Sequence, residues 1–201
     1  MKFCRGDATD KHLVIGLQHE FFRCHDAFQE FASRASALIL AGTNREASYR
    51  AYNAYARFIH HLYEFLVGAV KRDRQDTAAI QADDAERTIQ REAGRALAQR
   101  REGIIKGYAP PWENDLSAYP ISVPAEFARE FRRHRNITLA HVGIERHSLS
   151  LSSFYRDFHP FLYMIYSDAR FTWGTRPGEF PDLREITDFS VMVEALGAPA
   201  P

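Results

Sequence analysis

Cysteine and long apolar runs are both scarce in this sequence of 201 residues. Cys4 and Cys24 are the only cysteines, and they form neither a CxxC pair nor a repeated spacing. This scarcity argues against a disulfide framework and a zinc ribbon, and it is typical of a reducing compartment. No window approaches the roughly 18 uninterrupted apolar residues of a membrane helix, and the first residues, MKFCRGDATDKH, lack the apolar run of a signal peptide. We therefore expect a cytoplasmic protein without a membrane contact.

The sequence has a formal net charge of zero, because 26 basic residues balance 26 acidic ones. A protein that coats polyanions would carry a strongly basic balance, so any contact with nucleic acid has to be local. Lysine accounts for four of the basic residues and arginine for the other 22. Arginine grips phosphates with two hydrogen bonds at once. The GxxxxGK[ST], GxGxxG and GxSxG motifs are absent, which argues against a phosphate-binding loop and a serine hydrolase.

Apolar residues recur at helical spacing along most of the chain. The periodicity predicts a first helix from about residue 11 to 41, ended by Gly42 and Asn44, and a second from about 45 to 72. The second helix should bury one side, formed by Tyr52, Tyr55, Ile59, Leu62, Leu66 and Val70. No segment alternates as a strand does. We predict a single all-α domain over residues 1–201, a bundle of four to six helices.

Residues 73–106 differ in composition from the rest of the chain. They are rich in Ala, Gln, Glu and Arg, and their apolar stripe is thin, consisting of Ile80, Ile89 and Leu97. The pattern predicts an exposed, charged helical segment that projects from the bundle or pairs with another chain, or that is partly disordered.

Prolines and glycines separate the predicted helices in the second half of the chain. The prolines of GYAPPWENDLSAYPISVP, residues 107–124, predict a loop. Pro124 suits the first turn of a new helix, and a further helix should begin with Ser152 or Ser153 as its cap. The apolar residues that we expect these two helices to bury are Phe127, Phe131, Ile137, Phe154, Phe158, Phe161, Leu162 and Ile165. Residues 174–201 should form a C-terminal extension with a short helix from Leu183 to Leu196.

The helix after Pro124 contains the stretch RRHRNITLAHV, residues 132–142. In this stretch five residues separate Arg135 from His141, and Asn136 directly follows the arginine. Roughly three Arg–His pairs at this kind of spacing are expected by chance in a chain so rich in both residues. The local context therefore has to distinguish this pair from the others.

Two other pairs have a spacing of four to six intervening residues. Arg5 and His12 span the N-terminal end of the chain, and Arg129–His134 has the acidic Glu130 after its arginine. The pair Arg135–His141 alone combines a following Asn136, a small Ala140 before the histidine, and a position in the second half of an all-α chain.

This motif resembles the signature of the HEPN (higher eukaryotes and prokaryotes nucleotide-binding) domain family, which is Arg, four to six residues, then His, commonly with Asn, Asp or His after the Arg. The order of two long helices, a variable segment, a motif helix and an aromatic-rich helix is similar to the family plan over about residues 10–170. The resemblance implies a homodimer in which two motif helices face each other and form a composite site for metal-independent RNA cleavage. It also implies a toxin or anti-phage role, with an antitoxin protein as a partner.

The resemblance gives each residue of the motif a role. His141 would transfer protons, Arg135 would hold the phosphate and stabilise its developing charge, and Asn136 would orient the ribose, the phosphate or His141. On an ideal α-helix, Arg135 and His141 lie about 120° apart around the axis and about 9 Å apart along it. One copy would not bring them together, whereas two facing copies would.

Further polar residues are candidates to support this site. Those of the second helix share one stripe, and those of the motif helix lie within two turns of His141. They are Asn53, Arg57, His60 and Glu64 on the second helix, and His134 and Thr138 on the motif helix. The alternative for the first four is an ordinary solvated face.

Two other functions compete with RNA cleavage. One is a non-catalytic helical module that binds a nucleotide or a protein through the same cleft. The other is a metal-dependent hydrolase that uses His25, Asp26, His60 and His61, although HHLYE reverses the Glu-x-x-His order of di-iron bundles. For the leading hypothesis we expect neither a metal nor a cofactor.

Overall fold

A computed structural model describes residues 1–140, 144–174, 180 and 183–197 of the chain. The predicted all-α class is confirmed: within these residues the ordered secondary structure is helical, apart from a single β-bridge between Lys2 and Asp76. The six α-helices are α1 (Ala8–Ala41), α2 (Arg45–Asp73), α3 (Ala82–Ile105), α4 (Phe127–Arg135), α5 (Leu151–Trp173) and α6 (Arg184–Gly197).

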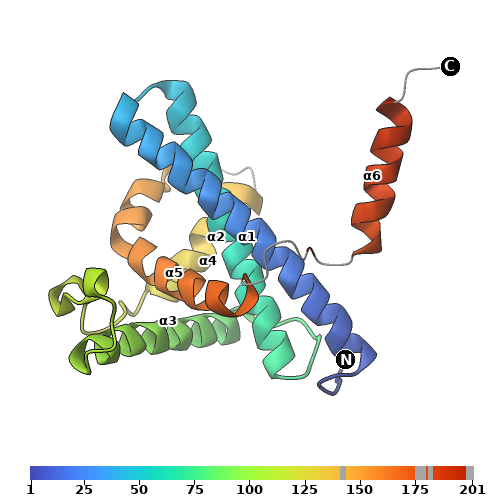
Figure 1. Cartoon of the computed structure of the whole chain (residues 1–201), viewed down its shortest axis with the longest axis horizontal. Coiled ribbons are helices and arrows are strands. Elements are labelled where there is room, and N and C mark those ends of the chain that lie inside the picture. Colours follow the sequence, from blue (N-terminus) through green and yellow to red (C-terminus); the bar gives the residue numbers. More distant parts are fainter. Residues whose placement is uncertain (141–143, 175–179, 181–182, 198–201) are drawn as a thin grey trace.

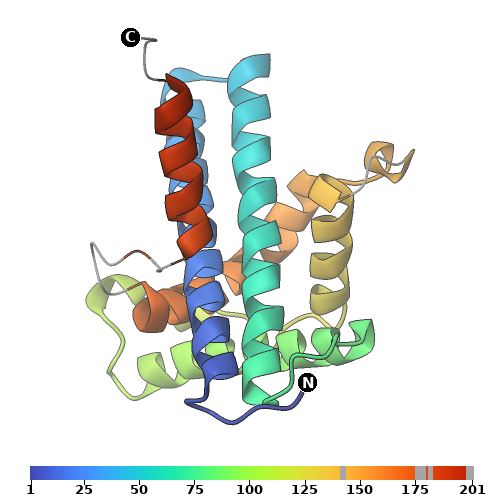
Figure 2. The same cartoon turned by 90° about the vertical axis from the view of Figure 1, so that its right-hand side faces the viewer.

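The two longest helices, α1 and α2, form an antiparallel hairpin that is the spine of the molecule (Figures 1 and 2). Gly42 ends α1 with a positive φ of 81°, a conformation in which a side chain would be strained. Asn44 then caps α2, its Oδ1 accepting from the amide of Ala47 at 2.8 Å. Near the other end a glycine brings the helices close, because a Cβ at Gly68 would lie 2.7 Å from Cδ2 of Leu17.

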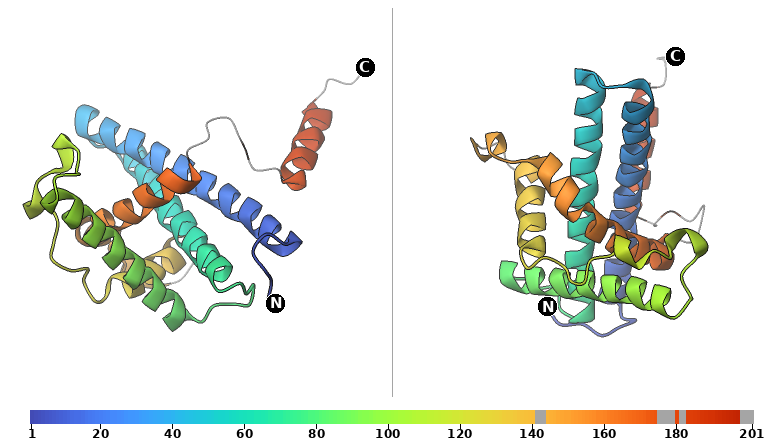
Figure 3. Two further views of the ribbon diagram at one scale, coloured as in Figure 1. Left: turned by 60° about the horizontal axis from the view of Figure 1, so that its bottom comes forward. Right: turned by 90° about the vertical axis from the view of Figure 1, so that its left-hand side faces the viewer.

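The predicted exposed segment 73–106 is corrected by the structure. Residues 74–81 form a connecting loop, and α3 lies across the end of the hairpin that carries the N-terminus of α1 (Figures 2 and 3). It packs against α5, α4 and α2 and does not project from them. Its buried side consists of Ala85, Thr88, Ile89, Ala93, Ala96 and Leu97. Alanines contribute little area each, but they allow a close approach of helices, and charged residues such as Arg87 and Arg91 are exposed.

Residues 107–126 form the predicted loop, which contains two short 3-10 turns, η1 (Pro111–Glu113) and η2 (Leu116–Ala118). The helix that follows begins at Phe127, three residues later than Pro124. It ends as an α-helix at Arg135 and continues as a π-helical turn, η3 (Asn136–Ala140). After the undescribed residues 141–143, the 3-10 turn η4 (Ile144–His147) leads toward α5.

The core is built from α1 to α5 and is rich in aromatic rings. The cap of α5 is Ser150, whose Oγ accepts from the amide of Ser153 at 3.1 Å, so the prediction of Ser152 or Ser153 is wrong. The predicted apolar face of α5 is buried as expected. On α2 the prediction of a buried residue fails for Tyr52, which is 41% exposed. In the turn η3, Ile137 was also predicted to be buried and is only partly so.

Helix α6 stands apart from the bundle (Figures 1 and 3). It covers nearly the whole of the short helix expected in the C-terminal extension, and its apolar residues Phe189, Val191 and Met192 are exposed. Phe180, in the connection before it, lies 5.7 Å from the ring of Phe22. Among the described helices, none has the length and apolarity required to cross a membrane.

His159 of α5 makes the stability of the core depend on pH. Its ring stacks on Tyr155 at 4.5 Å, and burial lowers its pKa from 6.5 to about 4. The folded protein therefore binds this proton less readily than the unfolded chain, so stability is full above about pH 6.5 and falls as the pH drops toward 4. We expect the free energy of unfolding to fall by about 2 kcal/mol through this residue between pH 7 and pH 5.

The measurement is urea unfolding at both pH values for the wild type and for His159→Phe, which keeps an aromatic ring and removes the titration. The difference between the two proteins isolates His159 from the other histidines. An equal loss of stability in both would show that His159 does not carry this effect.

Candidate active site

A polar pocket of about 380 Å³ opens between α1, α2 and the end of α4. Its polar lining combines three helices: Glu20 and Arg23 from α1, His60, His61 and Glu64 from α2, and Arg135 from α4. Two imidazoles, two carboxylates and two guanidinium groups therefore share one small concave surface. Such a set can bind an anion and transfer protons.

Arg135 is held in place on three sides. Its Nη2 forms an ion pair with Oε1 of Glu64, and its Nη1 donates to Oδ1 of Asn136 at 2.8 Å. The guanidinium carbon also lies 5.5 Å from the centre of the Tyr63 ring. The Nε atom is buried and has no hydrogen-bond partner among the described residues. The planar cation thus has a fixed orientation before any ligand arrives.

His61 and Glu20 form a hydrogen-bonded pair across α1 and α2, with Nδ1 2.7 Å from Oε1. Burial alone would raise the pKa of Glu20, but the hydrogen bond and the charge of His61, with that of Arg23, outweigh burial and lower it. Because Glu20 occupies Nδ1, Nε2 is the ring nitrogen of His61 that remains for a ligand. This is the arrangement by which a carboxylate orients a catalytic histidine.

His60 lies beside this pair, its ring perpendicular to that of His61 at 5.2 Å between centroids. Burial, followed by the positive charges of Arg135 and His61, lowers the pKa of His60. Its Nδ1 is buried without a hydrogen-bond partner among the described residues. The lowered pKa therefore favours an uncharged His60 near pH 7.

Not all of the other predicted site residues line this pocket. His141 lies outside the described residues, directly after the π-helical turn that begins at Asn136. Asn53 and Arg57 do not line the pocket, and Arg57 pairs with Glu30 of α1 at 2.5 Å. Of the predicted stripe on α2, only His60 and Glu64 reach Arg135's pocket.

His134 and Thr138 were expected to line an open cleft, and the structure corrects this expectation. Both residues are buried. The ring of His134 stacks on Phe154 at 4.2 Å, and its Nδ1 lies 2.9 Å from the carbonyl oxygen of Glu130. Thr138 donates its hydroxyl to the carbonyl oxygen of His134 at 2.7 Å. Both side chains turn into the core because they follow the stripe of Phe127 and Phe131.

The histidines proposed as metal ligands do not converge. His25 lies on α1 but does not line the pocket, and its Nδ1 is 2.6 Å from the hydroxyl of Tyr166 on α5. His61 is instead hydrogen-bonded to Glu20. Within the residues that the structure describes, no group of three or more His, Cys, Asp or Glu side chains has a geometry suited to a metal ion.

Glu20 and Arg23 are the residues of the pocket that sequence reasoning missed. They lie on α1, and no spacing connects them to residues about 40 positions later on α2. The only available signal was the unusual pair His60–His61, which had suggested a metal instead.

Comparison with known proteins gives no relative from which a function can be read. No family model matches the chain, and neither the curated proteins nor the solved structures give a significant match. Function is therefore inferred from the chemistry of the pocket itself.

Proposed function

We propose that this chain is a HEPN-like endoribonuclease that cleaves RNA without a metal ion, at a site completed by two copies of the chain. The observation that carries the proposal is the placement of Arg135. Its guanidinium, oriented by Glu64 and Asn136, lies in a pocket that also contains His60 and His61. Phosphodiester cleavage by an internal hydroxyl requires this combination of a fixed cation and proton-transfer groups.

The proposed reaction is attack of a ribose 2′-oxygen on the adjacent phosphorus. A base accepts the 2′-hydroxyl proton, the bond between the 2′-oxygen and phosphorus forms, and the bond to the 5′-oxygen breaks as an acid donates a proton to it. The products are a 2′,3′-cyclic phosphate and a 5′-hydroxyl. Arg135 would stabilise the charge on the non-bridging oxygens, and His141 would transfer a proton.

Glu64 sets a condition on phosphate binding. It already neutralises Arg135, so a phosphate has to compete with this carboxylate for the guanidinium. The side chain of Glu64 is 35% exposed, so water can solvate the carboxylate when it separates from Arg135. Glu64 would therefore hold Arg135 in position in the free protein and release it to the substrate.

The second copy of the chain enters the proposal through the motif. The resemblance of this motif to the HEPN signature implies two facing motif helices, which would supply an arginine and a histidine from opposite sides of one phosphate. In this proposal the protein acts in the cytoplasm as a toxin or an anti-phage component. A protein antitoxin would then bind the same cleft and block it.

Cleavage of total RNA and of tRNA in the presence of EDTA tests the proposed chemistry. We expect the rate to be unchanged by the chelator, because Arg135 and the histidines supply the charge and the proton transfer. End-group analysis should find 2′,3′-cyclic phosphates. Cleavage that stops with EDTA and returns with added Mg²⁺ or Zn²⁺, or the absence of cleavage in both RNAs, would contradict the proposal.

A further inference from the structure

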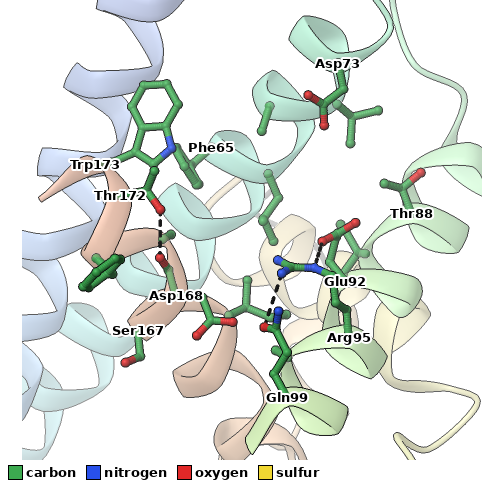
Figure 4. A pocket seen from close by; sticks show the side chains of 18 of the residues that line it. Phe65, Asp73, Thr88, Glu92, Arg95, Gln99, Ser167, Asp168, Thr172 and Trp173 are labelled. Carbon is green, nitrogen blue, oxygen red and sulfur yellow. Dashed lines mark hydrogen bonds and ion pairs between the residues drawn. The ribbon is translucent and has the colours of Figure 1, made fainter.

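A second and larger pocket, of about 570 Å³, lies between α2, α3 and α5, and its lining shares no residue with the Arg135 pocket (Figure 4). This volume is within the range of small-molecule sites. Its inner walls are apolar and include Phe65, Leu66, Ala69, Ile89, Ile165 and Ala169. A ligand here would contact carbon along these walls.

One side of this α2–α3–α5 pocket carries a guanidinium group that is fixed by its neighbours. Arg95 donates from Nε to Oε2 of Glu92 at 2.9 Å and from Nη1 to Oε1 of Gln99 at 3.3 Å. All three residues come from α3, and Figure 4 shows the guanidinium between the other two side chains. A guanidinium held in this way offers a flat face on which an aromatic ring can stack.

Another side of the pocket carries Trp173, at the end of α5. Its indole meets the ring of Phe65 edge to face, with centroids 5.6 Å apart and planes at 80°. Figure 4 shows Trp173 on the opposite side of the pocket from Arg95. The pocket therefore has a planar group on each of two sides, which suits a flat ligand.

Asp168 of α5 supplies an acceptor that no donor in the described part of the chain uses. Its Oδ1 accepts from Nη2 of Arg100 at 2.9 Å, while its Oδ2 is buried and has no hydrogen-bond partner among the described residues. Burial raises the pKa of this carboxyl group. An N–H group of a ligand that reached Oδ2 would recover the free energy of this missing hydrogen bond.

From these features we infer that the α2–α3–α5 pocket binds a planar nitrogen heterocycle with an N–H donor, as a nucleobase provides. A phosphate is disfavoured, because the charged residues of the lining are Asp73, Glu92 and Asp168 against Arg95 and Arg100, which gives a net negative charge. The base can arrive as a free nucleoside or as part of a single RNA strand, because both present the same ring. This inference does not depend on RNA cleavage at the Arg135 pocket.

Trp173 itself reports on the binding. The chain has two tryptophans, and Trp112 is 85% exposed on the loop before α4, so Trp112→Phe leaves Trp173 as the single emitter. The probes are adenosine, oligoadenylate and purine riboside, which has the ring of adenosine without its amino group. We expect adenosine to change the Trp173 emission with a Kd of about 0.1 mM, and purine riboside to bind about tenfold more weakly.

Arg95 and Arg91 provide a matched pair of variants on α3. Both side chains are exposed and both form ion pairs with Glu92, but only Arg95 lines the pocket. Arg95→Ala should weaken adenosine binding about tenfold, since it removes the stacking face, and Arg91→Ala should leave it unchanged.

The two sources of the base give different results in this titration. Adenosine binding as tightly as oligoadenylate assigns the pocket to a free nucleoside, and binding of oligoadenylate alone assigns it to an RNA strand. The inference is overturned if neither probe gives a saturable change. Equal binding of adenosine and purine riboside, or equal effects of the Arg91 and Arg95 variants, would overturn it as well.

Discussion

Arg135→Ala is expected to lower the rate of RNA cleavage by about 100-fold to 1000-fold, the usual cost of removing one group that stabilises transition-state charge. The guanidinium lies in the pocket with His60 and His61, and its contacts with Glu64 and Asn136 fix its plane. No neighbouring arginine of α4 lines this pocket. The measurement is the single-turnover rate on an RNA that the wild type cleaves, with EDTA present.

Arg133 supplies the matched control for this experiment. It lies two residues earlier on the same helix, its side chain is 49% exposed, and it pairs with Glu130 outside the pocket. Arg133→Ala should therefore change the cleavage rate by less than a factor of about three, which corresponds to a surface effect of about 0.5 kcal/mol. Equal losses in both variants would indicate a general electrostatic effect on RNA binding.

Substitution of Arg135 by lysine tests whether cleavage requires only the positive charge at this position or also the hydrogen-bonding geometry of the guanidinium. Arg135→Lys keeps the positive charge but cannot make two parallel hydrogen bonds to a phosphate. We expect cleavage between that of the wild type and that of Arg135→Ala. If Arg135→Ala folds like the wild type and cleaves RNA at the same rate, the proposed function is wrong.

The long helices of this fold were predictable because their large apolar residues repeat over many turns. Helices α1 and α2 begin and end within a few residues of the predicted positions. The course of α3 was not predictable in the same way, since its packing depends on Ala85, Ala93 and Ala96. Alanine is common on both buried and exposed helix faces, so its presence does not indicate which side of a helix is buried.

The candidate site was only partly predictable, for reasons that differ between residues. The burial of His134 and Thr138 follows from a pattern visible in the sequence, because positions 127, 131, 134 and 138 form one helical stripe. The pairing of Arg135 with Glu64 is a tertiary contact between residues 71 positions apart, and helical periodicity carries no information about it.

The π-helical turn is the feature that most changes the interpretation of the motif. If α4 continued regularly, His141 would follow Phe131, His134 and Thr138 on the buried stripe. The turn at Asn136–Ala140 changes the number of residues per turn, so the angle predicted between Arg135 and His141 no longer applies. A local departure of this kind, which is frequent at functional sites, was not visible in the amino-acid pattern.

The second large effect is expected on stability, from Phe58→Ala. Phe58 is fully buried at the centre of α2, with its ring 5.1 Å from Phe28 of α1 and 5.5 Å from Tyr166 of α5. Removing it leaves a cavity among three helices, and we expect the free energy of unfolding to fall by about 3–5 kcal/mol. Such a loss is a large part of the total stability of a typical domain. Urea unfolding followed by circular dichroism measures it.

Phe171→Ala is the control, since this phenylalanine on α5 is 82% exposed. Its removal should change the free energy of unfolding by less than about 0.5 kcal/mol. A loss below about 1 kcal/mol for Phe58→Ala would show that the three helices do not pack around this ring as described. The helix that contains Phe58 also carries the pocket residues His60, His61 and Glu64. RNA cleavage by the Phe58→Ala variant should therefore decline at the temperature where α2 unfolds. Below that temperature it should stay near the wild-type rate, which distinguishes a stabilising residue from a catalytic one.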